Sequence, residues 1–334
     1  MTSSAATSIA AVSGITVGHW TDLARATGCT VVLAPAGGMR AAGAVRGRAT
    51  GTRELDALDP RHLVSHIDAI LLTGGSAYGL GAADGVMRWL REHGRGLPVG
   101  PAGIVPIVPT AVIFDFDLAP GGKADRWPSA DDAYRACAAA SAEVGEGTVG
   151  AGTGATVGKA LGPRRATKGG VGTWAVRGGD IVVGALVVLN AVGNILDQTG
   201  AILAGARGPD GQFADALALF AQGTAPFGAL SRPDEGGGRH NTTLAVVATN
   251  AALERTALAS LAHAAGDALA RRIVPYGTLY DGDVVFAVST ATTRAAPLQT
   301  EALAALAVPV AVERAVRLAR GLGDVPGLAD GAAR

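Results

Sequence analysis

The sequence contains few aromatic residues, carries no net charge and has only two cysteines. Phe, Trp and Tyr make up 4% of the 334 residues, so a core must be built mainly from Ala, Val, Leu and Ile. The 28 basic residues balance the 28 acidic ones, and no basic patch stands out, which argues against nucleic-acid binding. Cys29 and Cys137 have neither a metal-binding spacing nor a disulfide framework, and Cys29 opens an apolar run typical of a buried strand.

Long hydrophobic runs are also missing. No apolar segment reaches the roughly 20 residues of a membrane span, and residues 1–11 lack the basic and apolar regions of a signal peptide. We therefore expect a cytoplasmic protein that does not enter a membrane. Hydrophobic residues still make up 49% of the chain and charged residues 17%, which excludes global disorder. The 49 glycines show no collagen period and predict tight turns and close backbone contacts.

Short apolar runs alternate with segments of helical periodicity. The strand-like runs are rich in β-branched residues and look like strands covered on both faces, and Asn250 is a plausible N-cap for the fourth helix. This mixture predicts an α/β fold in the broad sense. The expected strands are 29–34, 69–72, 111–116, 181–189, 244–249 and 284–290, and the expected helices are 77–92, 130–143, 214–221, 251–270 and 300–320.

Two glycine-rich segments resemble known functional motifs, a P-loop and a nucleophile elbow, but neither matches its motif. The segment 150–160 misses the P-loop spacing and is not followed by a convincing helix, so its glycines are interpreted as close backbone packing. Ser76 lacks the glycine two residues later that a nucleophile elbow requires. Ser76 is instead predicted to be the N-cap of a helix that begins at Ala77.

Thr242 stands where a glycine-rich, charged segment, 234–238, runs through Asn241 into the strand-like run 244–249. If the chain breaks before Thr242, its new α-amino group would have a pKa near ~8 and would lie beside its own hydroxyl. One residue would then supply both a nucleophile and a general base. The alternative is an ordinary Thr at the start of a strand.

Asp281 and Asp283 flank Gly282 just before another apolar run. Positions i and i+2 of a strand lie on one face, so two carboxylates there could act on one group and would raise the pKa of at least one of them. The alternative is an ordinary Asp-Gly hairpin turn.

Together with these residues, several motifs in the same order resemble a known family. The sequences 241–244 and 281–286 are similar to those of self-processing N-terminal-nucleophile hydrolases, the group of D-aminopeptidases, β-peptidyl aminopeptidases and endo-type nylon-oligomer hydrolases. The Asn-Thr junction and the paired aspartates look most like the nylon-oligomer branch. The resemblance extends over nearly the whole chain through segments 14–19, 72–80, 105–109, 147–155 and 167–172.

This resemblance implies an αββα fold, in which stacked sheets are sandwiched by helices. It implies a single catalytic domain, 1–334, that cleaves itself into chains 1–241 and 242–334. Asp281 and Asp283 would orient the ammonium and hydroxyl groups of Thr242. No metal or organic cofactor is needed, and the cleaved protomers would assemble as a homo-oligomer, a tetramer.

Further candidates complete the expected site. Asn190 ends a buried strand, and its amide could donate to an oxyanion, although it could also supply turn geometry and Asn194 is a rival by spacing. Lys168 in a glycine-rich turn could hold substrate or stabilise charge, or be a solvated loop residue. By resemblance, Tyr134 would support the oxyanion, unless it is a Tyr at the edge of the core. Ser76 and Tyr78 are expected to line the substrate site.

The predicted function is hydrolysis of amide bonds in short peptides or ω-amino-acid oligomers. A β-peptidyl or D-amino-acid aminopeptidase would use the same site, and an uncleaved, non-catalytic binding protein is the alternative of another class. The sequence does not separate these substrates.

Overall fold

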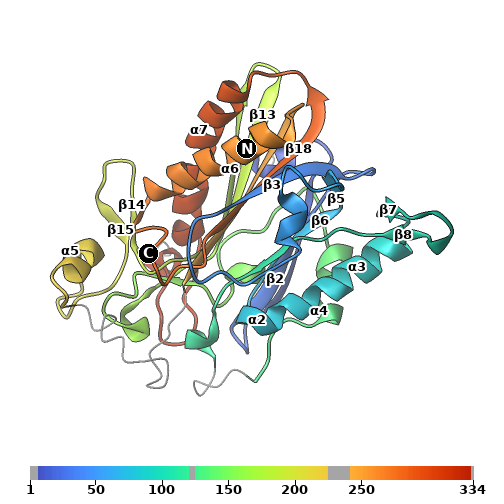
Figure 1. Cartoon of the computed structure of the whole chain (residues 1–334). Coiled ribbons are helices and arrows are strands. Elements are labelled where there is room, and N and C mark those ends of the chain that lie inside the picture. Colours follow the sequence, from blue (N-terminus) through green and yellow to red (C-terminus); the bar gives the residue numbers. More distant parts are fainter. Residues whose placement is uncertain (1–6, 120–124, 225–240, 332–334) are drawn as a thin grey trace.

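Two β-sheets packed face to face form the centre of the structure (Figure 1). The computed structural model describes residues 7–119, 125–224 and 241–331. The first sheet has the strand order β12-β13-β16-β18-β3-β5. Its strands are β12 (Val171–Gly178), β13 (Ile181–Asn190), β16 (Thr242–Ala251), β18 (Val284–Thr293), β3 (Met39–Val45) and β5 (His66–Ile67).

The second sheet has five strands in the order β1-β2-β6-β9-β4, and three small sheets lie outside the sandwich. The five strands are β1 (Thr16–Asp22), β2 (Thr27–Leu33), β6 (Ala69–Thr73), β9 (Thr110–Val112) and β4 (Thr52–Arg53). The small sheets pair β15 (Ile202–Ala204), β14 (Asn194–Leu196) and β17 (Ile273–Val274); β10 (Thr156–Val157) and β11 (Thr167–Lys168); and β7 (Leu97–Pro98) and β8 (Ile104–Val105).

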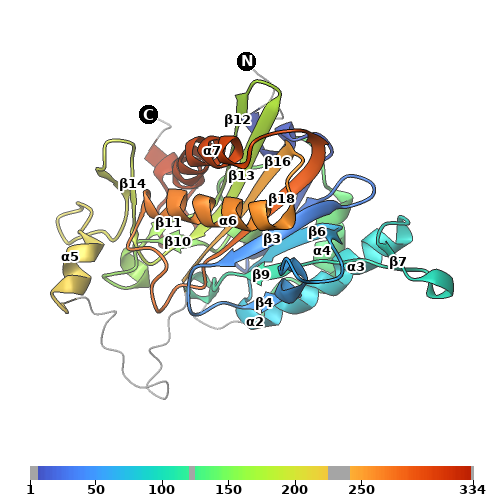
Figure 2. The ribbon, with the colours of Figure 1, turned by 45° about the horizontal axis from the view of Figure 1, so that its top comes forward.

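Helices cover both outer faces, which gives the predicted αββα order of layers. Helices α6 (Arg255–Ala270) and α7 (Pro297–Arg317) pack on the six-stranded sheet, while α3 (Ala83–Glu92) and α4 (Ala130–Ala138) pack on the five-stranded sheet (Figures 1 and 2). Helix α5 (Ala216–Ala221) and the hairpin β7–β8 lie at opposite ends of the molecule (Figure 2). No helix in the described ranges is both long and apolar enough to cross a membrane.

Short helical turns connect these elements. They are α2 (Ser76–Gly79), η1 (Ile9–Ala11), η2 (Leu55–Leu58), η3 (Leu80–Ala82), η4 (Gly100–Ala102), η5 (Phe116–Leu118), η7 (Gly150–Gly152), η8 (Pro163–Arg165) and η11 (Leu328–Gly331).

Strand β13 shows why the central strands are continuous apolar runs. Side chains alternate along a strand, and both faces of β13 are covered. Val183 and Val187 pack in the cluster beneath α6 and α7, whereas Leu186 and Val188 pack in the cluster between the two sheets. Because no residue of β13 faces solvent, the strand needs no polar position along its length.

The register of the six-stranded sheet places the predicted site residues together. Strand β16 pairs antiparallel with β13, which sets Thr242 opposite Asn190. It also pairs parallel with β18, and an isolated bridge joins Asn241 to Asp281. The start of β16, the end of β13 and the segment before β18 therefore meet at one end of the sheet.

Several details of the predicted elements are wrong. Asn250 does not cap a helix, because it lies within β16 and its side-chain oxygen accepts a hydrogen bond from the Val182 N–H at 2.8 Å. Helix α6 begins only at Arg255, after Glu254. The expected helix 130–143 ends at Ala138. Pairing of Ala251 with Thr293 and the side-chain hydrogen bonds of Asn250 override the local helical pattern of these residues.

Candidate active site

Three hydrogen bonds hold Asn241, whose carbonyl forms the peptide bond to Thr242. The Thr242 hydroxyl donates to the Asn241 carbonyl oxygen at 2.6 Å, and the Gly282 N–H donates to the same oxygen at 2.6 Å. The Asn241 N–H in turn donates to the Tyr280 carbonyl at 3.0 Å. A backbone N–H that donates to a carbonyl oxygen polarises it and stabilises negative charge that develops there.

Gly282 lies so close to the Thr242 side chain that any larger residue would displace its neighbours. A Cβ atom at Gly282 would lie 2.7 Å from the Thr242 hydroxyl oxygen and 2.7 Å from the Ala49 carbonyl oxygen. Its backbone is not in the left-handed region, so space and not conformation favours glycine here. The glycine between the two aspartates thus belongs to the site.

Asp283 fixes the backbone next to Thr242. Its carboxylate accepts hydrogen bonds from the Thr243 N–H at 2.5 Å and from the Gly277 N–H at 3.1 Å. Burial, together with the neighbouring charge of Asp281, raises the pKa of the Asp283 carboxyl well above its usual range.

Asp281 lies beside Asp283 and accepts hydrogen bonds from the Thr278 N–H at 2.9 Å and the Thr278 hydroxyl at 2.6 Å. Burial raises the pKa of Asp281, and the positive charge of Lys159 opposes that rise. Strand β18 pairs with β16 and β3 and not with β17, so Asp281-Gly282 is not the turn of a hairpin. The two carboxylates are instead buried against the start of β16.

Asn190 lies directly opposite Thr242 and is held in one orientation. Its side-chain oxygen accepts hydrogen bonds from the buried Lys159 ammonium at 2.8 Å and the Thr156 N–H at 3.0 Å. Its amide nitrogen donates to the Phe114 carbonyl at 2.9 Å. Because two donors bind the oxygen, the nitrogen end faces Phe114, a residue of the pocket that contains Thr242.

Asn194, the rival by spacing, lies elsewhere. It belongs to β14, and its amide nitrogen donates to the Ala214 carbonyl at 2.7 Å. Of the two asparagines, only Asn190 is the register partner of Thr242.

Lys168 is buried and is not a solvated loop residue. Its ammonium donates to the carbonyls of Gly152, Ala155 and Gly169 at 2.7 to 2.9 Å, which accounts for its three N–H donors. Burial lowers the pKa of Lys168 to about 7, and the carboxylate of Asp115 opposes that shift. These contacts place Lys168 in the packing of the glycine-rich segment.

Asp115 holds the turn that carries Ser76. Its carboxylate accepts hydrogen bonds from the Gly75 N–H at 2.8 Å and the Thr27 hydroxyl at 2.6 Å. Burial raises the pKa of Asp115 to about 6, although these hydrogen bonds and the charge of Lys168 oppose the rise.

Ser76 shares a pocket with Thr242. Ser76 is not the N-cap of the helix, as the sequence predicted, because Gly75 takes that position and Ser76 is the first helical residue. Its φ of 50° is a left-handed conformation that costs energy for a non-glycine residue, a strain found often at functional sites. The pocket measures about 280 Å³ and is lined by Ala49, Thr50, Gly51, Ser76, Ala77, Val112, Phe114 and Thr242.

Neither of the two candidate tyrosines lines this pocket. Tyr78 is 63% exposed and stacks on Trp127 at 4.4 Å between ring centroids. Tyr134 lies on α4, where its hydroxyl donates to Glu92 at 2.6 Å and Arg88 lies over its ring. Helix α4 covers the outer face of the five-stranded sheet, so the structure does not bring Tyr134 to Thr242.

Sequence reasoning did not identify Lys159, Asp115 or Gly282 as site residues. A signal exists for the first two, because each is a charged residue within an apolar segment and is fully or almost fully buried. Charged residues in such positions are rarely buried without a specific partner. The glycine-rich segment 234–238, expected to be the processing loop, lies outside the described residues. Within the described ranges, no group of three His, Cys, Asp or Glu residues could hold a metal ion.

Comparison with known proteins identifies the family of this chain. The model of peptidase family S58 matches residues 7–319. An uncharacterized aminopeptidase of Mycobacterium tuberculosis is 48% identical over 297 residues, which cover 85% of this chain and 81% of that protein. The 6-aminohexanoate-oligomer endohydrolase of Paenarthrobacter ureafaciens is 33% identical over 278 residues, or 79% of this chain and 69% of that protein.

Solved structures with low sequence identity share the fold. The L-aminopeptidase D-Ala-esterase/amidase of Ochrobactrum anthropi, described as a variant of the Ntn hydrolase fold, has a TM-score of 0.70 at 19% identity and covers 96% of this chain and 88% of its own. A β-aminopeptidase of Burkholderia sp. has a TM-score of 0.67 at 24% identity, with coverage of 96% and 90%.

The family match defines an amide-bond hydrolase, and its αββα fold is shared with a variant of the Ntn hydrolase fold. The chain belongs to peptidase family S58.

Proposed function

We propose that this single-domain chain cleaves itself between Asn241 and Thr242 and then hydrolyses amides with Thr242 as its amino-terminal nucleophile. One observation carries the proposal: the Asn241 carbonyl oxygen lies 2.6 Å from both the Thr242 hydroxyl and the Gly282 nitrogen. This closeness supports the Thr242 hydroxyl as the attacking group and the Gly282 N–H as an oxyanion donor at a bond within the chain.

Maturation follows from this arrangement. The Thr242 hydroxyl oxygen attacks the Asn241 carbonyl carbon, and its proton passes to the amide nitrogen as the C–N bond breaks. The Gly282 N–H stabilises the oxyanion between these events. Water then hydrolyses the resulting ester, which leaves a carboxylate on Asn241 and frees the hydroxyl and α-amino groups of Thr242. The products are chains 1–241 and 242–334.

In turnover, the free amine of Thr242 takes the hydroxyl proton, and the oxygen attacks the substrate carbonyl. Asn190 donates from its amide nitrogen to the oxyanion, and Lys159 holds the other end of that amide. The amine then protonates the leaving group, and water releases the acyl group. Asp281 and Asp283 hold the ammonium and the backbone of Thr242 in place.

The substrates are amides of short peptides or of ω-amino acids, as the 6-aminohexanoate-oligomer relative suggests. The second candidate is a β-peptidyl or D-amino-acid aminopeptidase, which the named activities of the structural neighbours favour. The cleaved protomers form a homo-tetramer, which light scattering of the purified protein tests.

Intact-mass analysis and amino-terminal sequencing test the central proposal. Active protein should contain two chains, and the smaller, of residues 242–334, should begin Thr-Thr-Leu. Thr242→Ala should stay as one folded chain without activity. A single full-length chain in an active wild-type sample would refute the mechanism, and a single inactive chain would favour a binding protein. Rates on α-peptides, β-peptides and ω-amino-acid oligomers then decide the substrate class.

A further inference from the structure

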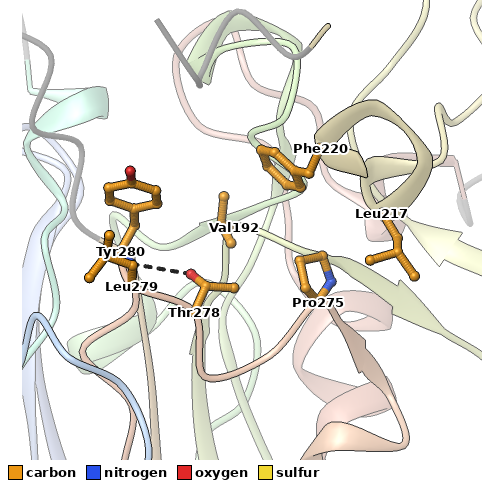
Figure 3. Close-up of a pocket in the computed structure, with 7 residues that line it drawn as sticks. All are labelled: Val192, Leu217, Phe220, Pro275, Thr278, Leu279 and Tyr280. Carbon is orange, nitrogen blue, oxygen red and sulfur yellow. Dashed lines mark hydrogen bonds between the residues drawn. The ribbon is translucent and has the colours of Figure 1, made fainter. Parts of the chain in front are cut away.

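A second pocket, of about 320 Å³, lies beside the paired aspartates and shares no lining residue with the pocket that contains Thr242. Figure 3 shows that α5 contributes to one side of this pocket and the segment 275–280 contributes to another, with Val192 between them. The seven lining residues are Val192, Leu217, Phe220, Pro275, Thr278, Leu279 and Tyr280. None of these side chains carries a charge.

This pocket is connected to the site through Asp281. Thr278 donates to the Asp281 carboxylate from both its N–H and its hydroxyl. Val192, on another side of the pocket, follows the end of β13 at Asn190 by two residues. The wall of the apolar pocket therefore includes the residue that holds the aspartate.

The chain before the scissile bond shows which part of a substrate would reach this pocket. The Asn241 N–H donates to the carbonyl of Tyr280, whose side chain lines the pocket. In self-cleavage Asn241 is the acyl residue. A substrate residue that takes the place of Asn241 has its backbone nitrogen directed to Tyr280. The group attached to that nitrogen, on the side away from the scissile bond, therefore meets the apolar pocket.

We infer that this pocket binds an uncharged, apolar segment on the acyl side of an amide substrate, one group beyond the residue joined to the scissile carbonyl. This inference rests on the proposed function and specifies its substrate class. A free ammonium group in the pocket would lose its hydration without gaining a charged partner from the lining residues. The pocket therefore favours extended amides with internal scissile bonds over substrates that end in a charged amine at this point.

Two pairs of chromogenic substrates test this on the cleaved, mature protein. Each pair has the same p-nitroanilide leaving group and differs by an N-hexanoyl cap: alanyl with N-hexanoyl-alanyl, and 6-aminohexanoyl with N-hexanoyl-6-aminohexanoyl. Burial of one methylene group changes an equilibrium about fourfold, so two buried methylenes predict kcat/KM about 15-fold higher for the capped member of at least one pair.

Leu217→Gln provides the variant and Leu306→Gln the matched control. Both are leucines of helices, 50% and 60% exposed, and only Leu217 lines the pocket. Leu217→Gln should lower the ratio of capped to uncapped kcat/KM about fivefold, whereas Leu306→Gln should leave it unchanged. Melting temperatures of both variants verify that they are folded.

The outcomes separate this inference from the proposed function. Equal kcat/KM for capped and uncapped substrates, or cleavage of uncapped substrates alone, overturns the inference while the proposed function stands. Cleavage of neither pair, nor of the three amide classes, overturns both. Leu217→Gln could instead change the oligomeric state and leave the ratio of capped to uncapped kcat/KM unchanged. That result would identify the pocket as part of an interface between copies of the chain, and it also overturns the inference.

Discussion

Replacement of Gly282 by alanine tests whether its N–H is the oxyanion donor of maturation. The added Cβ would lie 2.7 Å from both the Thr242 hydroxyl oxygen and the Ala49 carbonyl oxygen. Ordinary contact requires a separation of about 3.5 to 4 Å between carbon atoms. The segment must therefore move by several tenths of an ångström, which lengthens the 2.6 Å hydrogen bond from the Gly282 N–H to Asn241.

The expected cost follows from that hydrogen bond. Loss of one oxyanion donor lowers a rate by about 10² to 10³, or roughly 2.7 to 4 kcal/mol in the barrier. Gly282→Ala should therefore slow self-cleavage by at least about 100-fold. Because the backbone at Gly282 is not left-handed, alanine does not strain its dihedral angles, and the variant should fold.

The assay follows the fraction of full-length chain over time on denaturing gels, with intact masses at the end points. Gly81→Ala is the matched control, because a Cβ there meets no atom within 4 Å. The control should mature at the wild-type rate. Wild-type maturation of a folded Gly282→Ala protein would refute the role assigned to this N–H group.

Three further predictions concern the nucleophile and its surroundings. Thr242→Ser retains a hydroxyl and should still cleave itself and turn over substrate, as intact mass and steady-state rates would reveal. Asp283→Asn should lower maturation or turnover by about 10²-fold or more, with little change in melting temperature, because relief of repulsion offsets lost hydrogen bonds; wild-type rates would return Asp283 to a structural role. Burial raises the pKa of Asp115 to about 6 from 3.8, so its carboxyl favours folding below pH 4 and that contribution is lost as pH rises through 6. Asp115→Asn should therefore gain about 2.4 kcal/mol relative to wild type between pH 4 and pH 7, measured by urea unfolding, and an equal difference at both pH values would contradict this.

The local pattern of apolar residues predicted the strands correctly where both faces of a strand are buried. Strands β2, β6, β13, β16 and β18 were predicted as apolar runs, because a strand in the middle of a sandwich has no solvent-facing positions. The same logic failed at Asn250, where pairing across the sheet outweighs a local capping preference.

For the proposed site, the sequence by itself determined which residues are the candidates for the chemistry. Thr242 after a glycine-rich segment and the pair Asp281 and Asp283 are proposed from their residue types and their order along the chain. The layered fold followed from the ordered motifs and not from periodicity, because stacking of two sheets leaves no local signature that distinguishes it from other α/β arrangements.

Only the tertiary structure decided how those residues are supported. It placed Asn190 and not Asn194 opposite Thr242, bound Lys159 to Asn190, and set Tyr134 on an outer helix. It also brought the N–H of Gly282 to a carbonyl 41 residues earlier in the chain. These contacts join segments far apart in sequence through sheet register and close backbone approach, and neither quantity is encoded in the neighbours of a residue along the chain.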